Sequence, residues 1–166
     1  MAELSAQPEM FVHTPSFRKH CLLSFDHTPV VAAVQAAVDL LRPTLVSKLG
    51  IHATMVELAA LISRSGADAQ PVHRDVGLTG EEESEVFTVQ LILQDTDEAM
   101  GPLVVEPGTH RAPLEARPER QIALPSPKGS LVLFNGRLRH CGGAHFGGLD
   151  RVTAYVTFMQ SKEAGP

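Results

Sequence analysis

The sequence predicts a mainly β domain of jelly-roll type, either a sandwich or a barrel, flanked by one helix. Two observations predict it. From about residue 53 the chain consists of short apolar segments separated by glycine and proline turns, and most of its glycines and prolines lie after residue 70. Before residue 50, one stretch instead has apolar residues at helical spacing. Many short strands divided by turn residues are typical of sandwiches and barrels.

Length and charge narrow the class of protein. The chain has 166 residues, of which 43% are hydrophobic, and this suits one ordinary domain with a real core. It carries 14 basic and 19 acidic residues, for a net charge of −5, with no basic stripe that could neutralise phosphates. We therefore expect no nucleic-acid partner. Apolar runs are too short for a membrane span, so we expect no membrane partner either.

The cysteines and the N-terminus indicate the compartment. Cys21 and Cys141 stand 120 positions apart, and nothing in the sequence supports a disulfide between them. The first residues lack the basic start and apolar run of a secretory signal. We expect a reduced, cytoplasmic protein. Residues 1–25 show no steady period and are expected to form a loose or peripheral N-terminal extension before a domain over residues 26–166.

The helix is expected over residues 28–49, where apolar side chains recur every three or four positions. Thr28 suits the N-cap, Pro29 the first helical position, and Gly50 the residue after the end. Pro43 removes one backbone donor, which predicts a kink or two short helices. This helix is expected to pack on a sheet as scaffold.

The expected strands alternate with turn residues along the rest of the chain. They cover residues 55–62, 72–76, 86–93, 103–105, 122–124, 131–134, 139–141 and 152–159.

A metal site is indicated by His73, Asp75 and His140. In a strand, residues i and i+2 point to the same face, so His73 and Asp75 can aim at one point. His140 ends a predicted hairpin before a Gly-Gly turn and is the best third ligand. Two imidazoles and one carboxylate leave three positions of an octahedral metal open, as in non-haem Fe(II) oxygenases. A His-x-Asp sequence alone also occurs as a surface pair.

Arg151 adds a second feature to this site. It lies eleven residues after His140 and opens the last predicted strand, where Thr153 and Tyr155 share its face. A guanidinium at the mouth of a barrel can clamp a carboxylate through two parallel hydrogen bonds. The alternative is a charge at a strand edge beside Asp150.

Four segments in order resemble the phytanoyl-CoA dioxygenase-like family of Fe(II)- and 2-oxoglutarate-dependent oxygenases. They are residues 70–75 (QPVHRD), 100–110 (MGPLVVEPGTH), 129–140 (GSLVLFNGRLRH) and Arg151. The resemblance covers roughly residues 50–160. It implies a double-stranded β-helix, which is a jelly-roll, cupin-like barrel. It also implies Fe(2+) as the metal, 2-oxoglutarate as cosubstrate and dioxygen as oxidant.

By this resemblance, His73, Asp75 and His140 would bind iron and Arg151 would bind the distal carboxylate of 2-oxoglutarate. Many members carry a serine two residues after the distal histidine, where its hydroxyl helps to hold the cosubstrate. Here that residue is Gly142, and Thr153 is the candidate replacement.

Three further residues or segments near these motifs carry expectations of their own. His110, in the Pro-Gly-Thr-His turn, is expected to be structural. His145 is the next candidate ligand should His140 point away. The loop over residues 77–85, with two glycines and four glutamates, is expected to form a mobile flap over the site.

The implied function is hydroxylation of a small-molecule substrate. Halogenating relatives replace the carboxylate ligand with a small residue, so Asp75 favours hydroxylation or a related oxidation. The alternatives are a non-catalytic jelly-roll protein that binds a metal or small acid, and a cupin enzyme with zinc or manganese. Arg151 argues against both, because neither needs a carboxylate clamp. The sequence names neither the substrate nor the oligomeric state.

Overall fold

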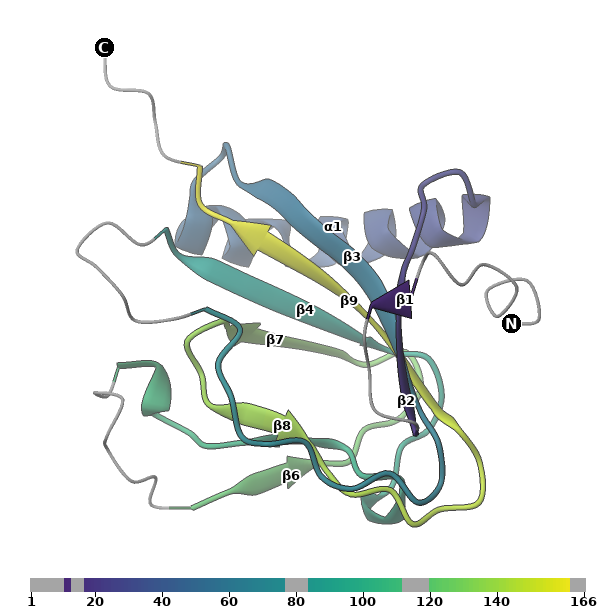
Figure 1. The fold of residues 1–166 in the computed structure, drawn as a ribbon. Helices are drawn as coiled ribbons and strands as arrows, with labels where there is room; N and C mark the ends of the chain where they lie inside the picture. The colour runs from purple at the N-terminus through teal and green to yellow at the C-terminus, as the bar shows by residue number, and fades with distance from the viewer. Residues whose placement is uncertain (1–10, 13–16, 77–83, 112–119, 162–166) are drawn as a thin grey trace.

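Two antiparallel sheets and one α-helix make up the described part of the chain (Figure 1). The computed structural model describes residues 11–12, 17–76, 84–111 and 120–161. The helix is α1 (Thr28–Leu49), and two short 3-10 helices are η3 (Glu98–Met100) and η4 (Thr109–Arg111). The strands are β1 (Phe11–Val12), β2 (Arg18–Leu22), β3 (Thr54–Ser63), β4 (Val86–Ile92), β5 (Leu103–Val105), β6 (Ile122–Leu124), β7 (Leu131–Asn135), β8 (His140–Gly142) and β9 (Arg151–Met159).

The larger sheet has the strand order β1-β2-β3-β9-β4-β7, and the smaller has the order β6-β5-β8. The last strand, β9, lies between β3 and β4 near the centre of the larger sheet, so the end of the chain is tied to its middle. The expectation of a mainly β structure with a flanking helix is confirmed. Seven of the expected strands match observed ones to within one residue at each end.

The expectation that residues 1–25 are loose was wrong for part of that segment. Arg18 to Leu22 form β2, which pairs along its whole length with β3, and β1 pairs with β2 in turn. The sequence Arg-Lys-His-Cys-Leu gives little sign of a strand, because one of its faces carries Arg18 and His20 rather than apolar residues. The division into an extension and a domain at residue 26 stays a prediction.

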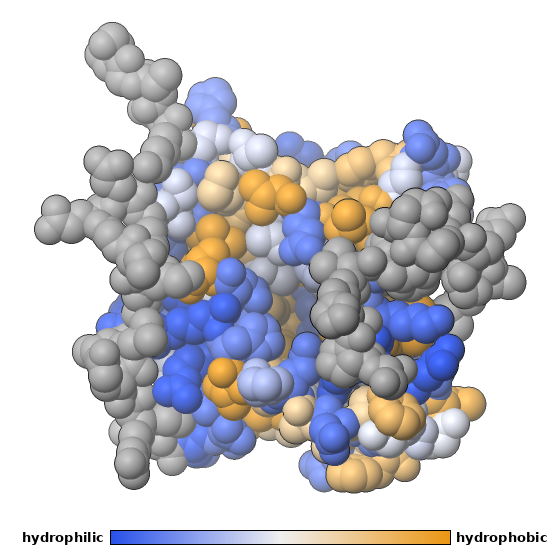
Figure 2. Space-filling model, viewed as in Figure 1, coloured by the Kyte–Doolittle hydropathy of each residue, from blue (hydrophilic) through white to orange (hydrophobic). Residues whose placement is uncertain are grey.

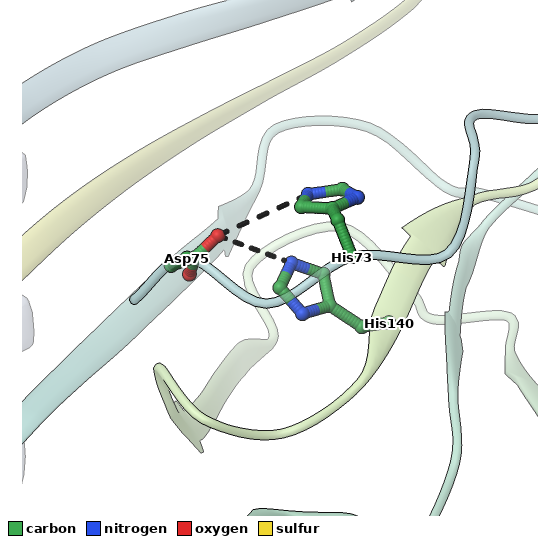
Figure 3. A group of neighbouring side chains, drawn as sticks. All are labelled: His73, Asp75 and His140. Carbon is green, nitrogen blue, oxygen red and sulfur yellow. Dashed lines mark ion pairs between the residues drawn. The ribbon is translucent and has the colours of Figure 1, made fainter. Parts of the chain in front are cut away.

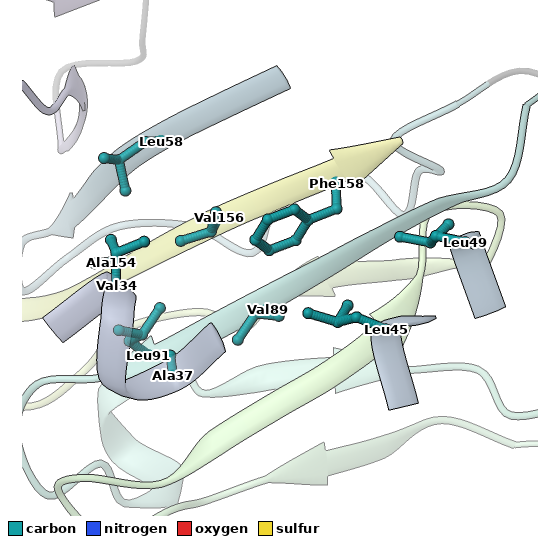
Figure 4. Close-up of a cluster of buried hydrophobic side chains, with 10 residues drawn as sticks. All are labelled: Val34, Ala37, Leu45, Leu49, Leu58, Val89, Leu91, Ala154, Val156 and Phe158. Carbon is teal, nitrogen blue, oxygen red and sulfur yellow. The ribbon is translucent and has the colours of Figure 1, made fainter. Parts of the chain in front are cut away.

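The helix α1 covers the outer face of the larger sheet, and the main core lies between them (Figure 4). Every second residue of β9 points to this side, as strand geometry requires. The buried members of the core are Val34, Ala37, Leu45, Leu49, Leu58, Val89, Leu91, Ala154, Val156 and Phe158. This packing confirms the scaffold role expected for the helix.

Details of α1 differ from expectation. The helix runs unbroken through Pro43 rather than dividing there. Pro43 and Asp39, whose carbonyl loses its partner, are both exposed, so water can satisfy that carbonyl. The N-cap is His27 rather than Thr28, without a side-chain cap, whereas Gly50 ends the helix with a φ of 79°.

The inner face of the larger sheet looks toward the smaller sheet. Leu103, Val105 and Phe134 form a second, smaller core between the two sheets. The expected strand over residues 72–76 is not formed, and instead His73 makes an isolated bridge to His140. The segment is too short of apolar pairing residues to extend the small sheet beyond that bridge.

Among the described residues, α1 is the helix long and apolar enough by composition to cross a membrane. Four of its apolar side chains are buried against the sheet, and 17% of its most apolar stretch is buried in all. The face of the molecule seen in Figure 2 mixes hydrophobic and hydrophilic residues rather than presenting one continuous apolar surface.

Candidate metal centre

The three predicted metal ligands lie together beside a cavity between the sheets. His140 begins β8, and its backbone exchanges two hydrogen bonds of 2.9 Å with that of His73. Asp75 Oδ1 lies 3.4 Å from His140 Nε2 and 3.9 Å from His73 Nε2 (Figure 3). One ligand atom from each residue falls within 4.8 Å of the others. The structure therefore brings the imidazole of His140 to His73 and Asp75, which precede it by more than 60 residues.

The cavity has a volume of about 770 Å³. The inner face of the larger sheet forms one wall, and β8 with the segment around His73 forms the other. The side chains of His73 and Asp75 are 42% and 29% exposed, whereas that of His140 is 7% exposed. A larger cavity, of about 940 Å³, lies between the end of α1 and β7 and contains none of the three.

Hydrogen bonds orient each candidate ligand. The Nδ1 atoms of His73 and His140 lie 2.9 Å from the carbonyl oxygens of Pro71 and Leu138. A carbonyl can only accept, so Nδ1 carries a proton in each ring, and Nε2 is the atom that offers a lone pair to a metal when the ring is neutral. Thr88 on β4 donates to Asp75 Oδ2 at 3.1 Å, which leaves Oδ1 facing the imidazoles. Such outer contacts are the usual supports of a metal site.

Charge couples Asp75 and His140. Burial by itself would raise the pKa of Asp75, but the hydrogen bond and charge of His140, with the Thr88 hydrogen bond, outweigh it and lower that pKa. Burial would likewise lower the pKa of His140, but the Asp75 carboxylate and the Leu138 carbonyl outweigh it, and the pKa of His140 is raised. Without a metal, the pair therefore favours a carboxylate beside a protonated imidazole.

The donor set fits a divalent transition metal. Imidazole nitrogen and carboxylate oxygen suit iron, zinc, nickel or manganese, and three ligands on one side leave positions open toward the cavity. The proton on His140 would have to leave, since only neutral imidazole binds a metal.

Arg151, the predicted carboxylate clamp, also lines this cavity. Its side chain is 2% exposed, donates from Nη2 to Ser63 Oγ at 3.0 Å and from Nη1 to the Gly101 carbonyl, and leaves Nε without a partner among the described residues. Burial, followed by the charge of Arg18, lowers the pKa of Arg151 to about 10. The alternative of a strand-edge charge beside Asp150 does not describe this buried side chain.

Thr153 lies two residues further along β9, on the same face as Arg151. It is 2% exposed, and its Oγ1 has no hydrogen-bond partner among the described residues. Buried polar atoms normally have partners, so the Thr153 hydroxyl and the Arg151 Nε are two donors still available on the inner face of β9.

Sequence reasoning missed three residues around Arg151. Arg18 donates from Nη1 to Ser63 Oγ at 2.7 Å, and Gln70 Oε1 accepts from the backbone amide of Gly142 at 2.8 Å. Neither Arg18 nor Ser63 belongs to a motif, and only the pairing of β2, β3 and β9 brings them to Arg151. Gln70 belongs to the segment QPVHRD, and its position three residues before His73 is the sequence feature that could have indicated its place near the site.

The remaining expectations have different outcomes. His145 is fully buried outside the site, and both its ring nitrogens are engaged, by the Leu149 carbonyl and the Gly147 amide. His110, in η4, lines the larger cavity and not the one with the three ligands. The expected flap over residues 77–85 falls mostly on residues 77–83, which lie outside the described residues.

Comparison with protein families gives one match. The model of the family described as Phytanoyl-CoA dioxygenase (PhyH) matches residues 12–152, a range that contains the three candidate ligands and Arg151. No curated protein sequence matches the chain.

Solved structures share the fold at low sequence identity. HygX from Streptomyces hygroscopicus, solved with nickel and 2-oxoglutarate, is 15% identical with a TM-score of 0.72, covering 96% of this chain and 76% of its own. The epimerase SnoN, solved with Fe³⁺, alpha-ketoglutarate and nogalamycin RO, is 15% identical with a TM-score of 0.64, covering 96% and 71%. EvdMO1 is 22% identical with a TM-score of 0.62, but this chain, covered over 74%, spans only 31% of EvdMO1.

Proposed function

Since the chain belongs to the phytanoyl-CoA dioxygenase (PhyH) family, we propose that it is an Fe(II)- and 2-oxoglutarate-dependent dioxygenase that hydroxylates a small-molecule substrate. The observation that carries the proposal is the group of His73, Asp75 and His140 on one side of a cavity that Arg151 also lines. The proposed cofactors are Fe(2+), 2-oxoglutarate as cosubstrate, and dioxygen.

His73 and His140 would hold the metal through Nε2, and Asp75 through Oδ1, the atoms that the outer hydrogen bonds leave free. Bound Fe(II) would supply the activation of dioxygen and the oxidative decarboxylation of 2-oxoglutarate to succinate. The protein's part is to orient both imidazoles through their Nδ1 hydrogen bonds, to fix the carboxylate, and to leave the opposite side open.

Arg151 would hold the distal carboxylate of 2-oxoglutarate. A Cβ atom on Gly142 would lie 3.2 Å from Arg151 Nη2, so this guanidinium sits over the residue two places after His140. Two residues of strand span about 7 Å, which is close to the length of a five-carbon diacid. Thr153 Oγ1, unpaired and on the same face of β9, is the proposed second donor.

The substrate is proposed to carry polar groups. The cavity wall includes His20, Glu57 and Tyr155, and the Tyr155 hydroxyl lies 2.5 Å from His20 Nε2 and 3.2 Å from Glu57 Oε1. Among solved structures of this fold, HygX has been solved with hygromycin B. Hydroxylation is the proposed reaction. Because SnoN, a protein of similar fold, is an epimerase, the chemical structure of the product should be determined in the test.

We propose further that the two sheets form a double-stranded β-helix, since they are antiparallel and face each other across the cavity. A domain over residues 26–166 and a cytoplasmic location are proposed from the sequence.

The test is an anaerobic titration with Fe(II) and then 2-oxoglutarate, which should produce the weak visible charge-transfer band of the chelate. Admission of air with candidate substrates should then release succinate. A band without succinate for any substrate would favour the alternative, a non-catalytic jelly-roll protein that binds a metal and a small acid. Absence of the band would remove the proposal.

A further inference from the structure

A row of three buried polar residues crosses the larger sheet at one end of the cavity. Arg18 on β2 pairs with Ser63 on β3, and Ser63 pairs with Arg151 on β9. Their exposed fractions are 4%, 0% and 2%. Ser63 Oγ accepts from Arg18 Nη1 at 2.7 Å and from Arg151 Nη2 at 3.0 Å, so one hydroxyl holds two guanidinium groups together.

The two positive charges have one carboxylate charge acting on them among the described residues, that of Asp68, which acts on Arg18 and opposes the effect of burial on its pKa. Among the described residues, neither guanidinium forms an ion pair with a carboxylate. Arg18 Nη2 instead donates to the carbonyls of Asp68 and Gly143, at 2.6 and 2.9 Å. Buried charges are costly unless they are paired, and two like charges raise that cost. Burial lowers the pKa of Arg18 as well as that of Arg151. Two buried guanidinium groups with one nearby carboxylate leave an excess positive charge, which a bound anion would balance.

Gly142 makes the approach of the two arginines possible. A Cβ atom at this position would lie 2.7 Å from Gln70 Oε1, 3.0 Å from Arg18 Nη1 and 3.2 Å from Arg151 Nη2. Real Cβ atoms avoid such contacts, so a side chain at position 142 would have to displace these groups. Polar groups thus fill the space that a serine would occupy.

We propose that Arg18 is a positioning residue of the carboxylate site, which fixes the Arg151 guanidinium through Ser63 and adds a second positive charge. The inference rests on the proposed function and extends it, because a doubly positive site favours a 2-oxo dicarboxylate over a 2-oxo monoacid. The glycine at position 142 leaves room for the Arg18 guanidinium, which then supplies the positive charge where a serine would supply a hydroxyl.

The first test uses Arg18→Met, which removes the charge but keeps much of the length, and Arg18→Lys, which keeps the charge but not the planar fork. Calorimetry measures 2-oxoglutarate on the Ni(II)-loaded protein, glutarate on the metal-free protein, and Ni(II) itself. Arg18→Met should weaken both acids by roughly tenfold to a hundredfold, as expected for the loss of a charged hydrogen-bonding group. The acid affinities of Arg18→Lys should lie between those of wild type and Arg18→Met. The Ni(II) affinity should not change in either variant. The control Arg42→Met, at an exposed arginine of α1, should bind both acids as wild type does.

The second test combines Arg18→Met with Gly142→Ser. In the wild-type background the serine meets Gln70 and Arg18, so Gly142→Ser should weaken acid binding. In the Arg18→Met background the contact with the Arg18 guanidinium is gone while that with Gln70 stays, so the same substitution should weaken acid binding less. A smaller loss in the second background shows direct coupling between the two positions.

The outcomes separate the two proposals. If wild type binds neither acid, the proposed function fails. If wild type binds both and Arg18→Met binds them equally well with only a lower melting temperature, Arg18 is merely structural and this inference is overturned. Should Arg18→Met not fold, Arg18→Lys and Ser63→Ala decide, since both are expected to weaken acid binding and unchanged affinity in both overturns the inference.

Discussion

At the scale of single residues, the two oxygens of Asp75 have different tasks. Oδ2 accepts from Thr88 on β4, and Oδ1 faces the two imidazoles. Thr88 is 4% exposed and cannot be replaced by water without a rearrangement of β4. The carboxylate is therefore aimed by a strand of the larger sheet, although it lies on the connection that leads to that strand.

Thr88→Val tests this role at nearly constant volume. Loss of an outer hydrogen bond typically lowers metal affinity by about tenfold to a hundredfold, and we expect a loss of that order for Ni(II), measured by calorimetry. Thr96→Val is the matched control, because Thr96 is also buried and its hydroxyl donates to the Gln94 carbonyl, away from the candidate ligands. Equal Ni(II) affinity for wild type and Thr88→Val would show that Asp75 needs no such support.

Arg151→Ala tests the carboxylate clamp. Removal of one partner of a buried charge pair costs about 3–5 kcal/mol, which at about 1.4 kcal/mol per tenfold weakens 2-oxoglutarate binding by roughly 10² to 10³. Arg151→Lys should recover part of the affinity, since an ammonium cannot offer two parallel bonds. A 2-oxoglutarate titration of the three Ni(II)-loaded proteins measures this. Identical affinities would remove Arg151 from the site.

Metal binding should release a proton from His140. Its pKa is raised in the metal-free protein by Asp75, so its stabilising contribution is present below the ordinary histidine pKa and lost as pH rises through the raised value. The pKa of Asp75 is lowered, so its contribution is present above the ordinary carboxyl pKa and lost at lower pH. Because a metal needs neutral imidazole, Ni(II) affinity should fall as pH falls through the raised His140 value.

Calorimetry of Ni(II) binding in two buffers of different ionisation enthalpy measures this proton. The observed enthalpies should differ near the raised pKa and converge at higher pH, where His140 is already neutral. The same enthalpy in both buffers throughout the range would mean that His140 does not carry the proton.

At the scale of elements, the sequence predicted the strands whose outer faces are apolar and missed the two strands before the helix, β1 and β2. β4 and β9 alternate apolar residues toward α1 with polar ones toward the cavity, and both were predicted. β2 places Arg18 and His20 on the inner face and lies between the edge strand β1 and β3. The sequence of β2 has the composition of a loop because its inner face borders a polar cavity rather than an apolar core.

The candidate ligands were predictable from spacing, whereas their supports were not. His73 and Asp75 are two residues apart. Their side chains approach the same point although the expected strand is not formed, because the bridge to His140 fixes the local backbone. Arg18 and Ser63 reach Arg151 only through the register of three strands. The register of these strands depends on pairing between segments that are far apart in the sequence, and the local sequence of one strand does not determine it.

Pro43 gives a prediction for α1. Pro43→Ala restores a backbone donor to the Asp39 carbonyl on the exposed side of the helix. An interior proline costs about 3 kcal/mol relative to alanine, and the greater freedom of the unfolded chain takes back about 1 kcal/mol. Urea denaturation should show a gain of about 1–2 kcal/mol with unchanged Ni(II) affinity. A loss of stability would mean that the helix depends on a bend at Pro43.

At the scale of the whole molecule, the candidate site joins the two layers. His140 comes from the smaller sheet, His73 and Asp75 from the connection between β3 and β4, and Arg151 from the centre of the larger sheet. The main core lies on the opposite face, against α1. The contacts between the sheets are fewer, since the smaller core has only three buried apolar residues. Ligands between the sheets should therefore stabilise the side of the molecule that packing stabilises least.

Hydrogen exchange measured by mass spectrometry tests this division. Ni(II) with 2-oxoglutarate should slow exchange in residues 70–76 and in β8, because a ligand at a hundred times its dissociation constant adds about 2.7 kcal/mol to the state that binds it. Exchange in α1 should not change, since the helix packs on the outer face and already belongs to the main core. Asp75→Ala, which lacks one ligand, is the control and should show no protection. Equal protection of α1 and β8 would mean that the molecule opens as one unit, with the two sheets no less firmly joined than the helix and the sheet.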